Sequence, residues 1–561
     1  MRFILLFLIY TPIFSQTVNY PKDFFRPPLD IPMQLSGNFG ELRPNHFHAG
    51  FDFKTQQKEG QIVHAAGDGY ISRIKISPFG YGKAIYIDHP NGYTTVYGHL
   101  QKGYGAIEKY IEAEQYKQQN YEVEIFPKPG ELPVMKGDTI AISGNTGGSE
   151  GPHLHFEFRD TKTEKIINPL YFGLEIKDTK RPFISTLVAY PIGDSSAVNQ
   201  SSRPIIINLN LQDDGTYIAE KVLASGRIGF GFTGADLDDV SYNNNGIFKV
   251  DAYVNGNPAF GYQFDSMAFD EGRYVNALID YPRYKKQQQR VQKLFMKQLY
   301  PLGIIHANAD YGIIKMQPNF SQLYRIDLSD FIGNKTSVLV PVDYSPLPAS
   351  IPSIEIKTPY LVRSAKDSNF EKDNMSVFFP ARTFYEDFYL NFDVKDKVMT
   401  VQDDYTPVHS NFLVTIKDSL ATNPEKTFIA SVSGKKLSYN TTKFKNGSFT
   451  SYTKNLGGFT LAKDTIAPKI SIAKPIAGKW LTKQKSIEIK ISDDLSGIKS
   501  YSGYINGKWV LFEYEYKEKK ITHVFDDALL NEGQNDLKVI VSDNLGNSAI
   551  FETQFFRSQK K

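Results

Sequence analysis

The chain contains no cysteine among its 561 residues. This absence excludes disulfide bonds, thiolate zinc sites and a cysteine nucleophile. It also excludes an acyl anchor on an N-terminal cysteine. Any metal ion bound by this chain must therefore be held by imidazole and carboxylate groups.

Strong net charge and long apolar runs are also lacking. A formal charge of +3 provides no basic stripe for phosphates, so we expect no nucleic acid partner. Arg2, a short apolar run and Ser15 are typical of a secretory signal peptide, predicted over residues 1–15, although a buried strand is an alternative. No later stretch is long and apolar enough for an integral membrane segment after cleavage. We therefore expect an exported protein, either periplasmic or secreted to the cell surface.

The length is too great for one hydrophobic core and predicts roughly three to five domains. After an N-terminal segment at 16–35, residues 36–175 are rich in glycine and in short Val/Ile/Tyr runs broken by turn signals. This pattern predicts an antiparallel sheet or barrel. An insertion at about 101–132 interrupts it, and composition predicts a short surface helix between Ile107 and Gln119.

The rest of the chain contains an internal repeat. The segment that begins at Asp178 recurs at Asp464, and the Ser-Asp turn at 329–334 recurs at 542–547. Two copies of one Ig-like β-sandwich, over 176–349 and 464–561, explain these matches, with 464–561 repeating 178–340. The first copy carries an insertion at about 282–300, where Arg283 to Leu299 has helical apolar spacing. Between the copies, 350–463 is predicted to be an all-β module.

Five of the ten histidines fall into three short signatures. His46, His48 and Asp52 belong to the first, His99 to the second, and His153 with His155 to the third. In a straight strand, positions 48 and 52 would lie roughly 13 Å apart, whereas ligand atoms of one zinc ion lie about 3 to 4 Å apart. The chain must bend between them, and Gly50 is a suitable place. His153 and His155 should point to the same face of a strand.

These signatures and the runs between them resemble the LytM/lysostaphin-type zinc metallopeptidases, which include the MepM-like murein endopeptidases. The resemblance covers about residues 36–170 and includes the runs Val63–Gly69, Gly80–Gly82 and Pro133–Asp138. It implies an all-β, multidomain protein, with a twisted antiparallel β-sheet peptidase domain followed by β-sandwich modules. No His-Glu-x-x-His signature is present, so thermolysin-like peptidases are excluded as a template.

Carried over position by position, the resemblance makes His48, Asp52 and His155 the ligands of Zn²⁺. It makes His99 and His153 the catalytic pair that orients or deprotonates water and stabilises the oxyanion. Two imidazoles and one carboxylate would leave a coordination position open, as catalytic zinc sites require. Glu150 stands where the family usually has a small hydroxyl residue, and the 101–132 insertion is predicted to narrow the cleft or to contact a partner.

The resemblance implies an exported zinc endopeptidase that hydrolyses peptide cross-links of peptidoglycan. The β modules would position it on the cell wall or bind a regulatory protein. Two alternatives stay open. The domain could be a non-catalytic wall-binding or regulatory protein, although all five site positions are filled, or the enzyme could cleave extracellular proteins.

Other polar residues are expected to be structural. His46 could be an alternative ligand but is better interpreted as a surface or outer residue, and His64 and His89 lie in strand-like runs. The Asp-x-x-Gly-Asn sites at Asp330 and Asp543 could suggest calcium. Hairpin turns capped by Asp side chains are the simpler interpretation.

Overall fold

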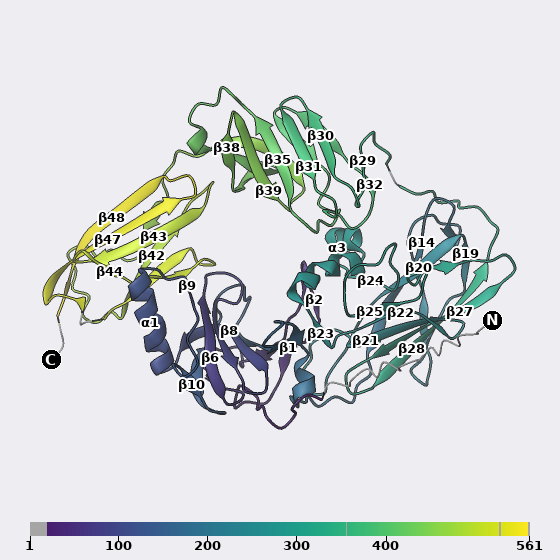
Figure 1. Ribbon diagram of the computed structural model, residues 1–561, viewed down its shortest axis with the longest axis horizontal. Coiled ribbons are helices and arrows are strands. Elements are labelled where there is room, and N and C mark those ends of the chain that lie inside the picture. The colour runs from purple at the N-terminus through teal and green to yellow at the C-terminus, as the bar shows by residue number, and fades with distance from the viewer. Residues whose placement is uncertain (1–18, 355, 527–528, 559–561) are drawn as a thin grey trace, which may run out of the picture.

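A computed structural model describes residues 19–354, 356–526 and 529–558, and Figure 1 shows its arrangement. The predicted signal peptide at 1–15 lies outside these residues. Four β-rich parts follow one another around a ring, in which the last part returns to the first beside helix α1 (Ala106–Gln118). Within the described residues, no helix has the length and apolarity needed to cross a membrane.

A mixed set of short and long strands builds the first part, in agreement with the predicted antiparallel sheet. Its central path runs β1-β4-β12-β8-β7-β6-β10, and β5, β9, β11, β13 and β23 pair with strands along it. The bounds are β1 Leu35–Gly37, β4 Phe51–Lys54, β5 Ile62–His64, β6 Gly69–Ile76, β7 Lys83–Asp88, β8 Tyr93–Gly103, β9 Val123–Ile125, β10 Pro133–Val134, β11 Thr139–Ser143, β12 His153–Asp160, β13 Ile166–Ile167 and β23 Ser266–Met267. A separate hairpin pairs β2 (Leu42–Arg43) with β3 (His46–Phe47), and a short helix, η1, spans Pro169–Phe172.

The insertion forms the predicted helix. α1 buries Ile107 and Ile111 against the first part, and its end is marked by Gln119 in the left-handed conformation. β9 then pairs with β6, which returns the chain to the sheet. The insertion therefore packs along the side of the sheet.

The second part contains two sheets that share a core with the first. One is β16-β14-β20-β24 with β26, and the other is β15-β19-β28-β27-β21-β22-β25 with β17 and β18. The bounds are β14 Phe183–Pro191, β15 Ala197–Val198, β16 Ile205–Ile207, β17 Leu209–Leu211, β18 Tyr217–Ala219, β19 Val222–Ser225, β20 Arg227–Ala235, β21 Lys249–Val254, β22 Asn257–Gln263, β24 Gln292–Lys293, β25 Ile305–Ala307, β26 Ile314–Lys315, β27 Ser321–Ser329 and β28 Lys335–Tyr344. The helices η2 (Phe269–Tyr274) and α2 (Val275–Leu278) lie between β23 and β24.

The predicted helix from Arg283 to Leu299 is wrong over most of its length. Helix α3 spans only Tyr281–Gln287 and ends at Gln288, which has a positive φ of 58°. After it, β24 pairs with β20, and Leu294 and Phe295 are buried. Val291, Leu294 and Phe295, which suggested one helix face, instead lie in the core of the second part, because tertiary burial outweighs helical spacing, whereas Leu299 is exposed.

The third and fourth parts each contain two facing sheets with their own cores. The third pairs β30-β31-β35-β39-β38 and β33-β34-β40-β36-β37, with a small β29-β32 pair. Its strands are β29 Leu361–Val362, β30 Ser368–Lys372, β31 Met375–Phe379, β32 Phe388–Tyr389, β33 Phe392–Lys395, β34 Val398–Val401, β35 Phe412–Lys417, β36 Thr427–Ser433, β37 Lys436–Tyr439, β38 Lys443–Lys445, β39 Ser448–Thr453 and β40 Gly457–Lys463, with helix η3 at Pro424–Lys426. The fourth pairs β41-β42-β46-β45 and β44-β43-β47-β48, with β41 Lys469–Ser471, β42 Ser486–Ser492, β43 Ile498–Ile505, β44 Lys508–Val510, β45 Glu513–Glu515, β46 Lys520–Val524, β47 Gly533–Asp543 and β48 Ser548–Arg557.

The fourth part closes the ring against the first. Lys83, almost fully buried, forms an ion pair with Glu513 at 2.8 Å. Tyr116 of α1 packs edge to face on Trp509, with ring centroids 5.2 Å apart. The insertion at 101–132 therefore contacts the chain's own C-terminal part.

Candidate metal centre

Neighbouring strands bring two of the three predicted ligands together. Asp52 lies on β4 and His155 on β12, and these strands pair so that the two residues are directly opposite each other. On the other side of β12, His155 lies opposite Gly98 of β8. Because directly opposed residues point to the same face of a sheet, Asp52 and His155 converge.

The third predicted ligand reaches the same point because the chain bends before β4. Gly50 lies at the bend, as expected, and a Cβ atom there would come within 2.1 Å of the carbonyl oxygen of Phe156. Only glycine permits so close an approach of two backbones. The bend turns His48 back toward Asp52.

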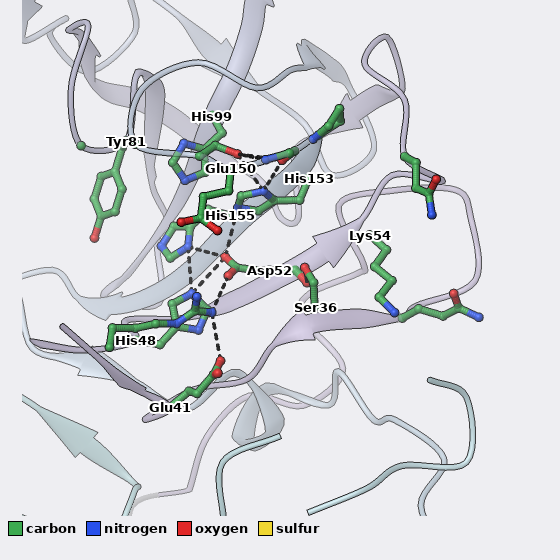
Figure 2. Close-up of a pocket in the computed structure, with 18 of the residues that line it drawn as sticks. Ser36, Glu41, His48, Asp52, Lys54, Tyr81, His99, Glu150, His153 and His155 are labelled. Carbon is green, nitrogen blue, oxygen red and sulfur yellow. Dashed lines mark hydrogen bonds and ion pairs between the residues drawn. The ribbon is translucent and has the colours of Figure 1, made fainter. Parts of the chain in front are cut away.

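The three side chains present their donor atoms to one point, as Figure 2 shows. His48 Nε2 and His155 Nδ1 each lie 2.9 Å from Asp52 Oδ1, and the two nitrogens are 3.2 Å apart. Tetrahedral zinc with bonds of about 2.0–2.1 Å has neighbouring ligand atoms roughly 3.3 Å apart. A zinc ion would therefore need these atoms to separate by only a few tenths of an ångström.

Each imidazole is oriented with one particular nitrogen toward the common point. His48 donates from Nδ1 to the carbonyl oxygen of Asn38 at 2.7 Å, which leaves Nε2 as the ligand atom. His155 donates from Nε2 to Glu157 at 2.8 Å, which leaves Nδ1 as the ligand atom. A metal-binding histidine is commonly oriented by such a carbonyl or carboxylate on its outer nitrogen.

The carboxylates around His155 are ionised despite burial. Burial alone would raise the pKa of Asp52, but His48, His153 and His155 hold it well below the usual value. Burial would also raise the pKa of Glu157, yet Arg159 and His155 lower it to about 2. Burial would lower the pKa of His155, but the two carboxylates raise it to about 9. Asp52 and Glu157 thus favour a positive charge at the position between them.

His99 and His153 lie beside the three donors. His153 Nε2 is 3.4 Å from Asp52 Oδ1, and the rings of His99 and His153 have centroids 4.7 Å apart. His99 donates from Nδ1 to the carbonyl of Thr146 and His153 to that of Gly151, both at 2.8 Å. A neutral ring with its proton on Nδ1 has Nε2 as its acceptor atom. Burial, followed by the neighbouring His153, lowers the pKa of His99 to about 3.

The backbone at His99 is held in an unusual conformation. Its φ is +57°, in the left-handed region that non-glycine residues seldom adopt. The residue's amide donates to the carbonyl of Tyr81 at 2.8 Å, which fixes this turn of β8. Such strain is often found where a side chain must be aimed at a functional site.

These groups line an open cleft of about 1150 Å³. Its walls carry the cations Arg43, Lys54 and, from the second part of the chain, Arg290. Glu150 extends into the cleft near His155 (Figure 2). No described residue between 101 and 132 lines the cleft. The lining therefore gives no support to the prediction that the 101–132 insertion narrows access to the cleft.

Several supporting residues were missed by the sequence reasoning. Glu157 is fully buried and accepts hydrogen bonds from His155, Tyr81 and Arg159. The Tyr81 ring also stacks on His155, with centroids 4.9 Å apart. Arg43 donates to the second oxygen of Asp52 at 3.1 Å. Glu157 could have been found, because position 157 shares the strand face of 153 and 155.

The remaining histidines near the cleft have other partners. His46 bonds the carbonyl of Pro44 and lies outside the donor cluster. His64 binds the Gly137 carbonyl and Asp30, and His89 binds the Asp68 carbonyl and Thr95. The expectation that His64 and His89 are structural agrees with these contacts.

The donor set fits zinc. It contains two imidazole nitrogens and one carboxylate oxygen, and it has an outer hydrogen-bond partner for each histidine. The open cleft beside it leaves room for a further ligand.

Comparisons with known proteins find similarity over parts of the chain. Residues 46–116 match Peptidase family M23, and residues 359–464 match the Zu5-like domain. An uncharacterized metalloprotease of Haemophilus influenzae is 34% identical over 158 residues, which are 27% of each chain. The peptidoglycan DD-endopeptidase ShyC of Vibrio cholerae is 34% identical over 143 residues, 24% of this chain and 27% of that protein. A zinc-containing peptidase from Vibrio cholerae of known structure is 28% identical, with a TM-score of 0.20, over 27% of this chain and 40% of that one.

The chain therefore carries an M23 peptidase domain of the LytM type within an all-β, multidomain architecture. The match spans only about a quarter of the length of these curated relatives.

Proposed function

We propose that this protein is an exported zinc metalloendopeptidase that hydrolyses peptide cross-links in peptidoglycan. The observation that carries the proposal is the convergence of His48, Asp52 and His155 beside His99 and His153 in an open cleft. The similarity to peptidoglycan DD-endopeptidases supports the choice of substrate. Action on peptidoglycan in turn supports a periplasmic or cell-surface location.

In this proposal, His48, Asp52 and His155 hold zinc. Bound zinc would polarise a peptide carbonyl and lower the pKa of a neighbouring water molecule. His99 and His153, whose Nδ1 protons are committed to backbone carbonyls, use Nε2 to accept a proton from water and return it to the leaving amine. Once protonated, either ring can also stabilise negative charge on the carbonyl oxygen.

The cations along the cleft suit a peptide that carries free carboxylates. Lys54 and Arg290 line the same cavity as the metal ligands, where Arg43 is already paired with Glu41 and Asp52. Stem peptides of the cell wall carry such carboxylates, and the surface charges would aid their capture. The β parts of the chain are proposed to present the peptidase domain to the wall or to a regulatory partner.

The test is digestion of purified peptidoglycan, followed by mass analysis of the released fragments. The wild-type protein should convert cross-linked fragments into un-cross-linked ones, and His48→Ala should abolish this release. His306→Ala is the matched control, because His306 is half exposed and pairs with Asp251 in the second part of the chain.

The alternatives give different results. A non-catalytic wall-binding protein would bind to sacculi without releasing fragments. An enzyme for extracellular proteins would cleave a glycine-rich protein substrate and leave the wall peptides intact. Either outcome would overturn the proposed substrate.

A further inference from the structure

Three aspartates gather at the corner where the second part of the chain meets the peptidase domain. Carboxylate oxygens of Asp178, Asp236 and Asp330 lie within 4.8 Å of one another. Ligand atoms on opposite sides of one calcium ion lie about 4.6 to 5.2 Å apart, given bonds of 2.3–2.6 Å. Three oxygens within 4.8 Å of one another are therefore close enough to share a single calcium ion.

Within the described residues, a buried amide oxygen without a hydrogen-bond partner belongs to a residue that lines the same cavity as this cluster. Asn245 is 7% exposed, and its Oδ1 has no hydrogen-bond partner among the residues that the structure describes, while its Nδ2 donates to Asp238 at 3.1 Å. Asn245 and Asp236 exchange two backbone hydrogen bonds, at 2.9 and 2.8 Å. Residues paired in this way direct their side chains to the same face. Asn245 and the three aspartates line one cavity of about 630 Å³.

Negative charges predominate at this corner. The charged groups that act most strongly on Asp236 are the carboxylates Asp178, Asp330 and Asp238, and after burial they raise its pKa to about 8. Glu175 and Lys177 also line the cavity. An uncharged Asn oxygen left without a donor is destabilising when buried, and a cation would satisfy it.

The turn predicted at Asp330 uses some of the hydrogen-bonding capacity of its carboxylate. Asp330 accepts hydrogen bonds from the amides of Gly333 and Asn334 and from the Asn334 side chain. The predicted Asp-capped turn is therefore confirmed. A carboxylate has about four acceptor positions, so these three bonds leave capacity for a metal ion.

We propose that Asp178, Asp236, Asp330 and Asn245 Oδ1 form a calcium-binding site. All four donors are oxygens, which calcium prefers, and the set contains no imidazole that would favour zinc. Water molecules in the cavity would complete the six to eight ligands.

The site is joined to the peptidase centre by a short path. Gly246, which follows Asn245, donates to Asn38 Oδ1 at 2.8 Å and accepts from Asn38 Nδ2 at 2.7 Å. The carbonyl of Asn38 in turn accepts from His48 Nδ1. A calcium ion held by Asn245 would therefore steady the loop that orients His48.

The test is calorimetric titration of calcium into the zinc-loaded full chain. The isosteric Asp236→Asn removes one charge and resembles the protonated aspartate, and Asn245→Ala removes the oxygen without changing charge. The equivalent corner of the repeat, with Asp464, Asp493 and Asp543, supplies the matched control Asp493→Asn.

Wild type and Asp493→Asn should share a binding event that Asp236→Asn weakens at least tenfold and Asn245→Ala weakens severalfold. Calcium should also raise the melting temperature of the wild type but not of Asp236→Asn. Identical titrations for wild type and Asp236→Asn would overturn the proposal, as would a binding event lost only in Asp493→Asn. Neither readout requires hydrolysis, so failure here is distinguishable from failure of the proposed function.

Discussion

Glutamate 157 gives the sharpest prediction for zinc binding, because it orients a ligand without touching the metal position. Its side chain is fully buried and accepts the Nε2 proton of His155 at 2.8 Å. Loss of such an outer partner typically weakens metal affinity 10- to 100-fold. At about 1.4 kcal/mol per tenfold, Glu157→Gln should therefore cost about 1.4–2.8 kcal/mol of zinc binding free energy.

The measurement is competition for zinc between the full chain and a chromophoric chelator. Glu164→Gln is the control, since Glu164 binds the same Arg159 at 2.8 Å from a half-exposed position but makes no contact with His155. An exposed ion pair contributes at most about 1 kcal/mol, and its loss should not affect the metal. Unchanged affinity in Glu157→Gln, or equal weakening in Glu164→Gln, would refute the orienting role.

Three further predictions concern catalysis and the junctions between parts. His99→Ala should keep stoichiometric zinc but lower turnover of peptidoglycan by about 10²–10⁴-fold, as loss of a general acid–base group does; loss of zinc instead would make His99 a ligand. Glu513→Ala should destabilise the chain by about 1–2 kcal/mol in urea unfolding, less than for a fully buried pair because Glu513 is 43% exposed. Burial would lower the pKa of Lys83, but Glu513 raises it overall. The difference in free energy of unfolding between the wild type and Glu513→Ala should therefore stay constant from pH 6 to 9 and decline only above the unfolded lysine pKa of about 10.4. When a chelator removes calcium, burial and the facing Asp178, Asp330 and Asp238 raise the pKa of Asp236 to about 8. The free energy of unfolding should therefore fall from pH 5 to 8 by at most about 1.4 kcal/mol per pH unit, and either Asp236→Asn or added calcium should remove that slope. A slope that persists in Asp236→Asn would contradict this prediction.

Local patterns in the sequence predicted the features that depend on neighbouring residues. The glycine at position 50, the alternation of His153 and His155 and the helix near Ile107 could each be found from spacing. The Asp330 and Asp543 turns could also be found, because an aspartate followed by Gly-Asn satisfies its own backbone.

Features that depend on distant contacts could not be predicted. Val291, Leu294 and Phe295 have helical spacing, but they are buried in irregular chain on either side of the short strand β24, which pairs with β20. Nothing local in the sequence links Lys83 with Glu513, which are 430 positions apart. The hydrogen bond from Gly246 to Asn38 also joins residues that are far apart in the sequence. These contacts form only where parts of the chain that are distant in sequence pack against each other.

The central claim is that His48, Asp52 and His155 hold one zinc ion. The most direct measurement is anomalous X-ray scattering at the zinc edge from crystals of the zinc-loaded full chain. The account predicts one strong peak about 2.0–2.2 Å from His48 Nε2, His155 Nδ1 and Asp52 Oδ1, lost in His48→Ala. A peak elsewhere, or one that survives the loss of His48, would contradict it.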